Sequence, residues 1–138
     1  MITEITIEMP AGKYYLGDPC YSVPDDRWIE WLDAADSENA GRVLIADLDG
    51  HKIIGFGTAY GDGEYRDQHG NTYGVDAGLI GLVPVEIAEN PYEGQEGCGR
   101  IVEFTEPFEC SRYKDGTLKF GEIVIETGDE EELPYLSV

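Results

Sequence analysis

The stretch VLIADLDGHKIIGFGT, residues 43–58, predicts a β-hairpin. Two apolar runs flank Asp49-Gly50, and such a dipeptide suits the favoured two-residue hairpin turn because both of its central residues need a positive φ. Asp115-Gly116 predicts a second hairpin turn of the same type further along the chain. Antiparallel strands joined by tight turns are therefore expected to dominate the fold.

Two glycines within this hairpin and an unbroken apolar run after it predict further features of the sheet. Gly55 and Gly57 bracket Phe56, and glycine inside a strand marks a bulge or a place where another group approaches the backbone closely. Residues 79–83 (LIGLV) are apolar without alternation. That pattern predicts a central strand buried on both faces.

Most of the remaining chain is typical of short strands. Residues 3–9 place Ile5, Ile7 and Met9 on one face, which is the period of a half-buried strand. Residues 13–16 form a second short strand, expected to be the hairpin partner of the first. Further strands are expected around Tyr65 and Tyr73 and over residues 100–104, 108–112, 117–120 and 122–127.

One helix is expected. Ser22 is its candidate N-cap and Pro24 suits a first helical turn. The apolar residues recur at helical spacing and form a stripe that should face the core: Trp28, Ile29, Trp31, Leu32 and Ala35.

These patterns predict an α+β fold, mainly antiparallel β: a curved sheet or partial barrel with one packed helix at about residues 23–35. The chain has 138 residues, the size of one ordinary domain. Residues 1–128 are expected to form a single β-rich domain, and residues 129–138 an acidic, mobile tail.

Charge is the compositional outlier. Twenty-nine acidic residues face nine basic ones, for a formal net charge of −20. Such a chain repels nucleic acid and anionic membranes, because both are bound by neutralising their phosphates with Lys and Arg. It attracts basic proteins or cations. Three explanations stay open: solubility or adaptation to a salty cytoplasm, docking on a basic protein, and cation binding.

No signal peptide or membrane span is evident in the sequence. The three cysteines, Cys20, Cys98 and Cys110, form no C-x-x-C pair. An odd count of unpaired cysteines fits free thiols in a reducing cytosol. A cytoplasmic location is therefore expected.

The segment from residue 58 to residue 79 is the densest candidate binding surface. Its glycines allow tight turns and close approach to a ligand, and tyrosines supply contact area at low entropic cost. The alternative is that these residues are ordinary hairpin turns with solvated acids. The candidate ligand-binding residues are Tyr60, Asp62, Glu64, Tyr65, Arg66, Asp67, Tyr73 and Asp76.

The sequence supports a catalytic or metal-binding site less well than a binding surface. The sequence lacks a G-x-S-x-G motif, and Asp62, Glu64 and Asp67 do not have the spacing of an EF-hand loop. The cysteines and histidines lack zinc-ligand spacing. No metal or cofactor is expected and no catalytic residue is assigned. A metal-dependent or carboxylate-based hydrolase that uses Asp62, Glu64, Asp67 or Asp76 remains the alternative. For an anionic ligand, the scarce basic residues single out Lys52, Arg66, Arg100 and Arg112.

Three strings resemble those of small uncharacterised proteins encoded by bacteria and their phages: YLGDPCY (residues 15–21), GTAYGDG (57–63) and VDAGLIG (75–81). The likeness covers roughly the first two thirds of the chain and carries no established activity. It implies a context in which small acidic proteins act as accessory factors that block or sequester part of a host system.

The functional prediction is a non-enzymatic, acidic binding protein. It would dock on a basic protein or sequester a small ligand such as a nucleotide, and would inhibit a host defence system on behalf of a phage or mobile element. Direct nucleic-acid and membrane partners are not expected. An open sheet edge would invite a homodimer. A structural domain whose acids serve only solubility is the third alternative.

Overall fold

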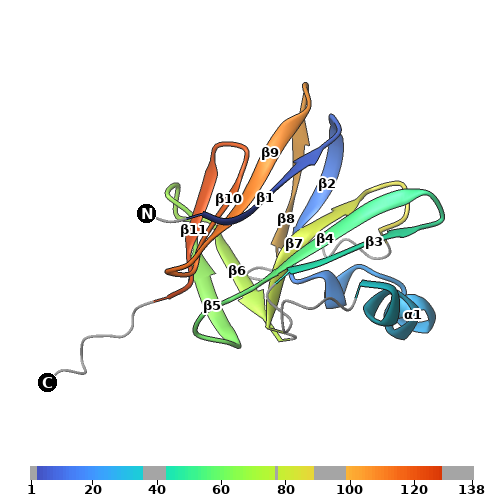
Figure 1. Ribbon diagram of the computed structural model, residues 1–138, viewed down its shortest axis with the longest axis horizontal. Helices are drawn as coiled ribbons and strands as arrows, with labels where there is room; N and C mark the ends of the chain where they lie inside the picture. Colours follow the sequence, from blue (N-terminus) through green and yellow to red (C-terminus); the bar gives the residue numbers. More distant parts are fainter. Residues whose placement is uncertain (1–2, 36–42, 77, 89–98, 129–138) are drawn as a thin grey trace, which may run out of the picture.

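The computed structural model describes residues 3–35, 43–76, 78–88 and 99–128. Figure 1 shows antiparallel sheets with a helix beside one of them. The strands are β1 (Thr3–Met9), β2 (Gly12–Gly17), β3 (Val43–Leu48), β4 (His51–Gly57), β5 (Gly63–Arg66), β6 (Thr72–Val75), β7 (Leu79–Pro84), β8 (Gly99–Phe104), β9 (Phe108–Tyr113), β10 (Thr117–Phe120) and β11 (Ile123–Glu126). The predicted fold class, mainly antiparallel α+β with one packed helix, is confirmed.

Within the described ranges the strands form three sheets. A four-stranded sheet has the order β1-β9-β10-β11, a five-stranded sheet has the order β3-β4-β7-β2-β8, and β5 pairs with β6. Neither large sheet closes into a barrel. The central strand of the five is β7, and all six of its residues are buried, as the unbroken apolar run predicts.

The five-stranded sheet separates two cores. On one face, Phe56 and Leu82 pack with Leu118 and Phe120 of the four-stranded sheet. On the other face, Ile53 and other apolar residues pack under the helix α1 (Asp25–Ala35). The fold is therefore layered as sheet, sheet and helix (Figure 1).

Both predicted hairpins form, but their turns differ. Between β3 and β4, Asp49 and Gly50 have φ values of 55° and 83°, as the two-residue turn requires. Between β9 and β10 the connection has three residues, and Asp115 keeps a negative φ while Gly116 has φ 95°. The Gly116 N–H donates to Tyr113 O at 3.0 Å. The prediction of a second turn of the same type is therefore wrong, because a glycine following a tight turn supplies the positive φ alone.

The expected pairing of residues 3–9 with residues 13–16 is also wrong. Strand β1 pairs with β9, whereas β2 lies between β7 and β8. The two strands belong to different layers. The reason is burial: Tyr14, Tyr15 and Leu16 are all buried, so β2 needs cover on both faces. A position inside the five-stranded sheet provides it, because the four-stranded sheet packs on one face and α1 on the other.

The helix begins at Asp25, two residues after the predicted start. Ser22 does not cap it, because the Ser22 hydroxyl is buried and has no hydrogen-bond partner among the described residues. A short 3-10 helix, η1 (Pro19–Tyr21), precedes it. There the Asp18 carboxylate accepts from Cys20 N–H at 3.0 Å and acts as the cap.

The apolar stripe of α1 faces the core only in part. Trp31 and Ala35 are buried, Trp28 and Leu32 are half-buried, and Ile29 is 63% exposed. The prediction that the whole stripe packs on the core is therefore wrong for Ile29. At 3.6 residues per turn, Ile29 falls outside the arc centred on Trp31 and Ala35.

Candidate functional site

The predicted binding segment folds into the β5–β6 hairpin and the loops that flank it, and its residues do not converge on one surface. The exposed ones are Tyr60, Asp62, Glu64, Arg66 and Asp76, while Tyr65 is half-buried and Asp67 and Tyr73 are buried. None of the eight lines either of the two pockets described below. The assignment of ligand-binding roles to them stays a prediction.

Asp67 and Tyr73 instead organise the β5–β6 loop. The Tyr73 hydroxyl donates to Asp67 Oδ2 at 2.7 Å. Asp67 Oδ1 accepts from the backbone N–H of His69 at 2.8 Å and of Asn71 at 3.0 Å. The buried carboxylate is thus satisfied entirely within its own hairpin, and it fixes where His69 lies.

The protonation of this pair follows from its surroundings. Burial raises the pKa of Tyr73 well above its usual range, and the Asp67 carboxylate raises it further, while Arg100 opposes both. Burial alone would raise the pKa of Asp67, but the hydrogen bonds from Tyr73, Asn71 and His69 together lower it below its ordinary value. Near neutral pH the pair is a neutral phenol bonded to a carboxylate.

We expect Asp67→Asn to lower the free energy of unfolding by about 1–3 kcal/mol at neutral pH, because it weakens a buried hydrogen-bond acceptor. A folded-state pKa below the unfolded value contributes stability above about pH 4 that is lost as the pH falls through the folded pKa. The difference between wild type and variant should therefore shrink in acid. Urea titrations from pH 7 to about pH 3 measure this difference, with the exposed Asp62→Asn as the control. A pH-independent difference would contradict the prediction.

The three resembling strings meet at one junction. Asp18 Oδ2 accepts from Asp76 N–H at 2.9 Å, and the Tyr21 hydroxyl donates to Asp76 Oδ2 at 2.6 Å. Thr58 N–H donates to Gly78 O at 3.0 Å, which joins the second string to the third. In this chain the three strings therefore share a structural role, which is to hold this junction together.

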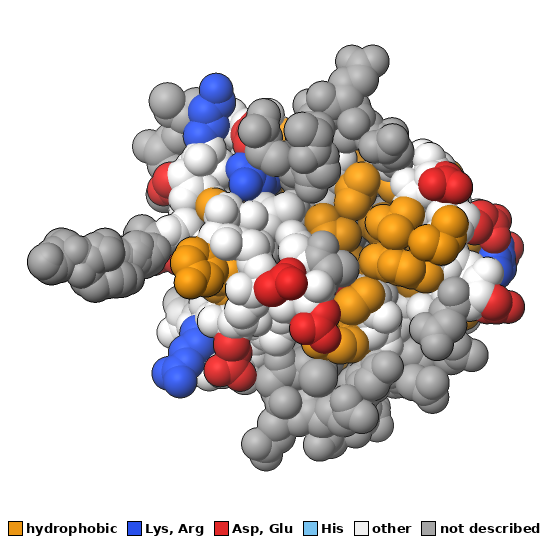
Figure 2. Space-filling view, turned by 90° about the horizontal axis from the view of Figure 1, so that it is seen from below, with side chains coloured by type: hydrophobic (Ala, Val, Ile, Leu, Met, Phe, Trp, Pro, Cys, Tyr) orange, Lys and Arg blue, Asp and Glu red, His pale blue; other side chains and the backbone are white. Residues whose placement is uncertain are grey.

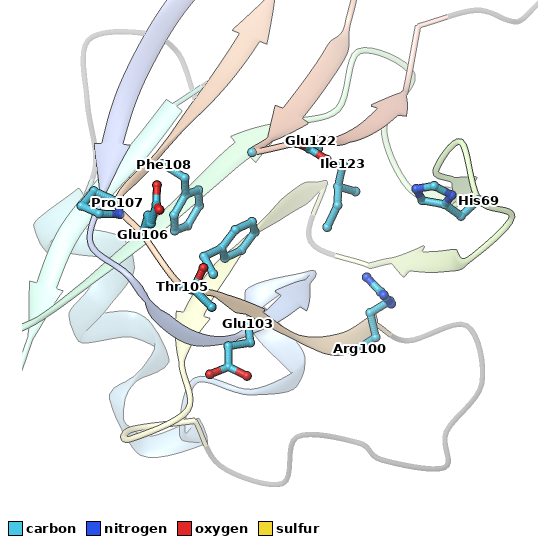
Figure 3. Close-up of a pocket in the computed structure, with 11 residues that line it drawn as sticks. His69, Arg100, Glu103, Thr105, Glu106, Pro107, Phe108, Glu122 and Ile123 are labelled. Carbon is cyan, nitrogen blue, oxygen red and sulfur yellow. The ribbon is translucent and has the colours of Figure 1, made fainter.

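A pocket of about 530 Å³ opens where the two large sheets part (Figure 3). It lies between β8, the β8–β9 connection, the β10–β11 turn and the β5–β6 loop. We name it the edge pocket, and its lining residues are His69, Arg100, Glu103, Phe104, Thr105, Glu106, Pro107, Phe108, Gly121, Glu122 and Ile123. Its volume lies within the range of small-molecule sites.

The candidate anion-binding residues are in different places. Arg100 lines the edge pocket, Arg66 is exposed on β5, and Lys52 Nζ donates to Glu8 O at 2.8 Å. Arg112 lines a second pocket of about 440 Å³. Its guanidinium, however, is bonded to Glu4 and to Gly57 O, so its charge is already neutralised.

An apolar area lies on the surface of α1. Figure 2 shows hydrophobic side chains gathered on the right of this view, where α1 lies, with acidic side chains at the margin. We name the surface formed by Trp28, Ile29 and Leu32 the helix patch. Asp26 and Asp33, both exposed, are three residues before and four after Ile29 on the same helix and therefore neighbour it on the helix surface.

The described ranges contain no assembled site for metal binding or thiol chemistry. There, no three His, Cys, Asp or Glu side chains come together so as to hold a metal ion, and the Asp67 carboxylate is occupied by hydrogen bonds. Burial raises the pKa of Cys110 to about 12, so this thiol is protonated and unreactive. Cys20 is half-buried, and Cys98 lies outside the described residues.

The fold and these surfaces define a layered antiparallel α+β protein with one pocket at the opening between its sheets. The chain matches no protein-family model, no curated protein and no solved structure. Among the described residues, no helix has the length and apolar character needed to cross a membrane.

Proposed function

We propose that this chain is a non-enzymatic binding protein that docks on a basic protein through the helix patch. The observation that carries the proposal is Ile29, a large apolar side chain that is 63% exposed on α1. Trp28 and Leu32, both half-buried, extend the apolar surface towards the core. Protein interfaces commonly have such an apolar centre with a polar rim.

The charge around the helix patch selects the partner. Asp26 and Asp33 are exposed beside Ile29, and Glu30 is exposed on the same helix. Arg27 pairs with Glu30 at 2.6 Å and with Asp49 at 3.1 Å, so it offsets only part of the local negative charge. A net charge of −20 adds a long-range field that speeds the approach of a basic partner at low salt.

We extend the proposal to the role of a phage or mobile-element accessory factor that inhibits a host system by occupying a basic host protein. Its support is the resemblance of the three strings to phage and bacterial proteins. The acidic surface is consistent with this role, because it would compete for a basic site that otherwise holds another polyanion.

We expect Ile29→Lys to weaken binding to a basic partner by at least about tenfold, because it replaces the apolar centre with a repelling charge. The probe is a synthetic helical peptide with leucines on one face and lysines on the other, measured by calorimetry at two salt concentrations. Ile45→Lys is the matched control, since Ile45 is 38% exposed on β3, on the strand face away from α1.

The peptide result is then repeated with proteins captured from a bacterial lysate and purified. A basic protein that binds wild type and Ile45→Lys but loses affinity for Ile29→Lys supports the proposal. Equal binding by wild type, Ile29→Lys and Ile45→Lys would show that charge alone drives the binding. Unchanged affinity for a scrambled peptide of the same composition would show the same. No binding of either kind would favour the view that the acids serve only solubility.

A further inference from the structure

We propose that the edge pocket binds a small molecule that joins one anionic group to an aromatic body. This inference goes beyond the proposed docking function, because the pocket and the helix patch use different residues. The charge on Arg100 is the first observation behind it. Arg100 lines the pocket, and within the described part of the chain no carboxylate pairs with it, although acidic residues outnumber basic ones by 29 to 9.

Arg100 lies near a neutral group. Its guanidinium is close enough to the Tyr73 phenol to lower the pKa of that phenol, and the Tyr73 hydroxyl donates to the buried Asp67 carboxylate at 2.7 Å. Because no carboxylate among the described residues pairs with Arg100, its charge is available for a ligand.

His69 belongs to the same arrangement. Its backbone N–H donates to Asp67 Oδ1 at 2.8 Å, so one carboxylate orders the loop that carries His69 and the tyrosine that contacts Arg100. Figure 3 shows the imidazole of His69 and the guanidinium of Arg100 at the same end of the edge pocket. Two planar nitrogen donors at one end suit a carboxylate or a phosphate.

The middle of the pocket is apolar. Phe104 and Phe108 stack with ring centroids 3.7 Å apart and planes at 14°, and the Tyr14 ring meets both edge-on. Figure 3 shows Ile123 between Phe108 and His69. A ligand held by Arg100 would therefore lay its body against aromatic and aliphatic side chains, which favours an aromatic group.

Carboxylates among the lining residues limit the ligand to a single anionic group. Glu103, Glu106 and Glu122 are exposed residues of the lining, and they would repel a second anionic group placed near them. Donor groups such as hydroxyls or an amine would suit the places beside these carboxylates. The ligand class is therefore an aromatic carboxylate or a monophosphate with an aromatic base, and not a polyanion.

The test is calorimetric titration of the full chain with two probes, indole-3-acetate and adenosine 5′-monophosphate, which separate the carboxylate source from the phosphate source. We expect at least one to bind, with Arg100→Gln weakening it by about tenfold or more, since a hydrogen bond to a charged group is lost. Arg66→Gln is the matched control, because it removes the same charge from an exposed site on β5 outside the pocket.

Uncharged adenosine and inorganic phosphate test the two halves of the proposed ligand, and each should bind at least about tenfold more weakly than the joined molecule. The unfolding midpoint of Arg100→Gln, compared with that of wild type, shows whether the variant is folded. If the midpoint is lowered, Phe108→Ser gives a second test from the apolar side. Absence of binding by both probes, or equal losses in Arg100→Gln and Arg66→Gln, would overturn the inference. Neither outcome bears on the helix patch, which Ile29→Lys tests separately.

Discussion

Gly81→Ala is expected to lower the free energy of unfolding by at least about 3 kcal/mol, a large fraction of the stability of an ordinary domain. Gly81 is buried in the central strand β7 and faces Gly55 of β4 and Gly17 of β2 in register. A methyl group on Gly81 would lie 1.9 Å from the carbonyl oxygen of Ile54 and 2.7 Å from Gly55 Cα. Both are backbone atoms, so a side-chain rotation cannot relieve the clash.

Gly55→Ala is the matched control for this prediction. Its added methyl group would lie 3.5 Å from the Trp31 ring and 3.6 Å from Leu79, which are ordinary contact distances. We expect a change of less than about 1 kcal/mol, because glycine-to-alanine changes at compatible sites gain from the unfolded state. Urea unfolding monitored by tryptophan fluorescence measures both variants. Similar midpoints for the two variants would contradict the argument.

Arg112→Met is expected to cost about 3 kcal/mol. Arg112 lies on β9 and is 4% exposed. Its guanidinium donates to Glu4 Oε1 at 2.6 Å on β1 and to Gly57 O at 2.8 Å on β4, so it ties the two large sheets together. Removing one partner of a buried ion pair typically costs 3–5 kcal/mol, roughly, and the Glu4 side chain, 20% exposed, should place this variant near the lower limit.

The second variant in this experiment is Arg112→Met with Glu4→Leu. Glu4→Leu also removes the carboxylate that has lost its bond to Arg112, so the double variant should recover about half of the loss or more. Arg27→Met, in the exposed pair with Glu30 and Asp49, should leave the unfolding midpoint nearly unchanged. A double variant no more stable than Arg112→Met would show that the bond to Gly57 O matters more than the ion pair.

The local pattern of the sequence predicts the elements well. Alternation and turn residues locate the β3–β4 hairpin, and the apolar run at 79–83 identifies β7 as central. The bulge offered as one meaning of Gly55 is not formed, because the register of β4 with β3 and with β7 is regular. The close approach offered as the other meaning stays a prediction, because a methyl group on Gly55 would meet the Trp31 ring at an ordinary contact distance of 3.5 Å.

The candidate sites were harder to predict from the sequence than the secondary-structure elements. Arg100 stood out because basic residues are scarce, but Phe104, Phe108 and Ile123 carried no signal of a pocket, since isolated apolar residues in short strands are typical of a core. Asp67 and Tyr73 looked like ligand residues because acids and tyrosines occur at binding surfaces. The structure shows instead that they bond to each other and that Asp67 also accepts from the His69 N–H.

The sequence by itself determined the class of fold, the strands, the positions of the two Asp-Gly hairpin turns and the acidic character of the surface, because periodicity, turn chemistry and charge are local or additive properties. The tertiary structure decided that β1 pairs with β9 and not with β2, that Ile29 faces outward, and that residues from β8, β9, the β10–β11 turn and the β5–β6 loop enclose one pocket. Strand pairing, side-chain exposure and the pocket all depend on which segments, distant in the sequence, bury their apolar faces against one another. Local sequence patterns do not specify those partners, so they are decided only when the layers pack.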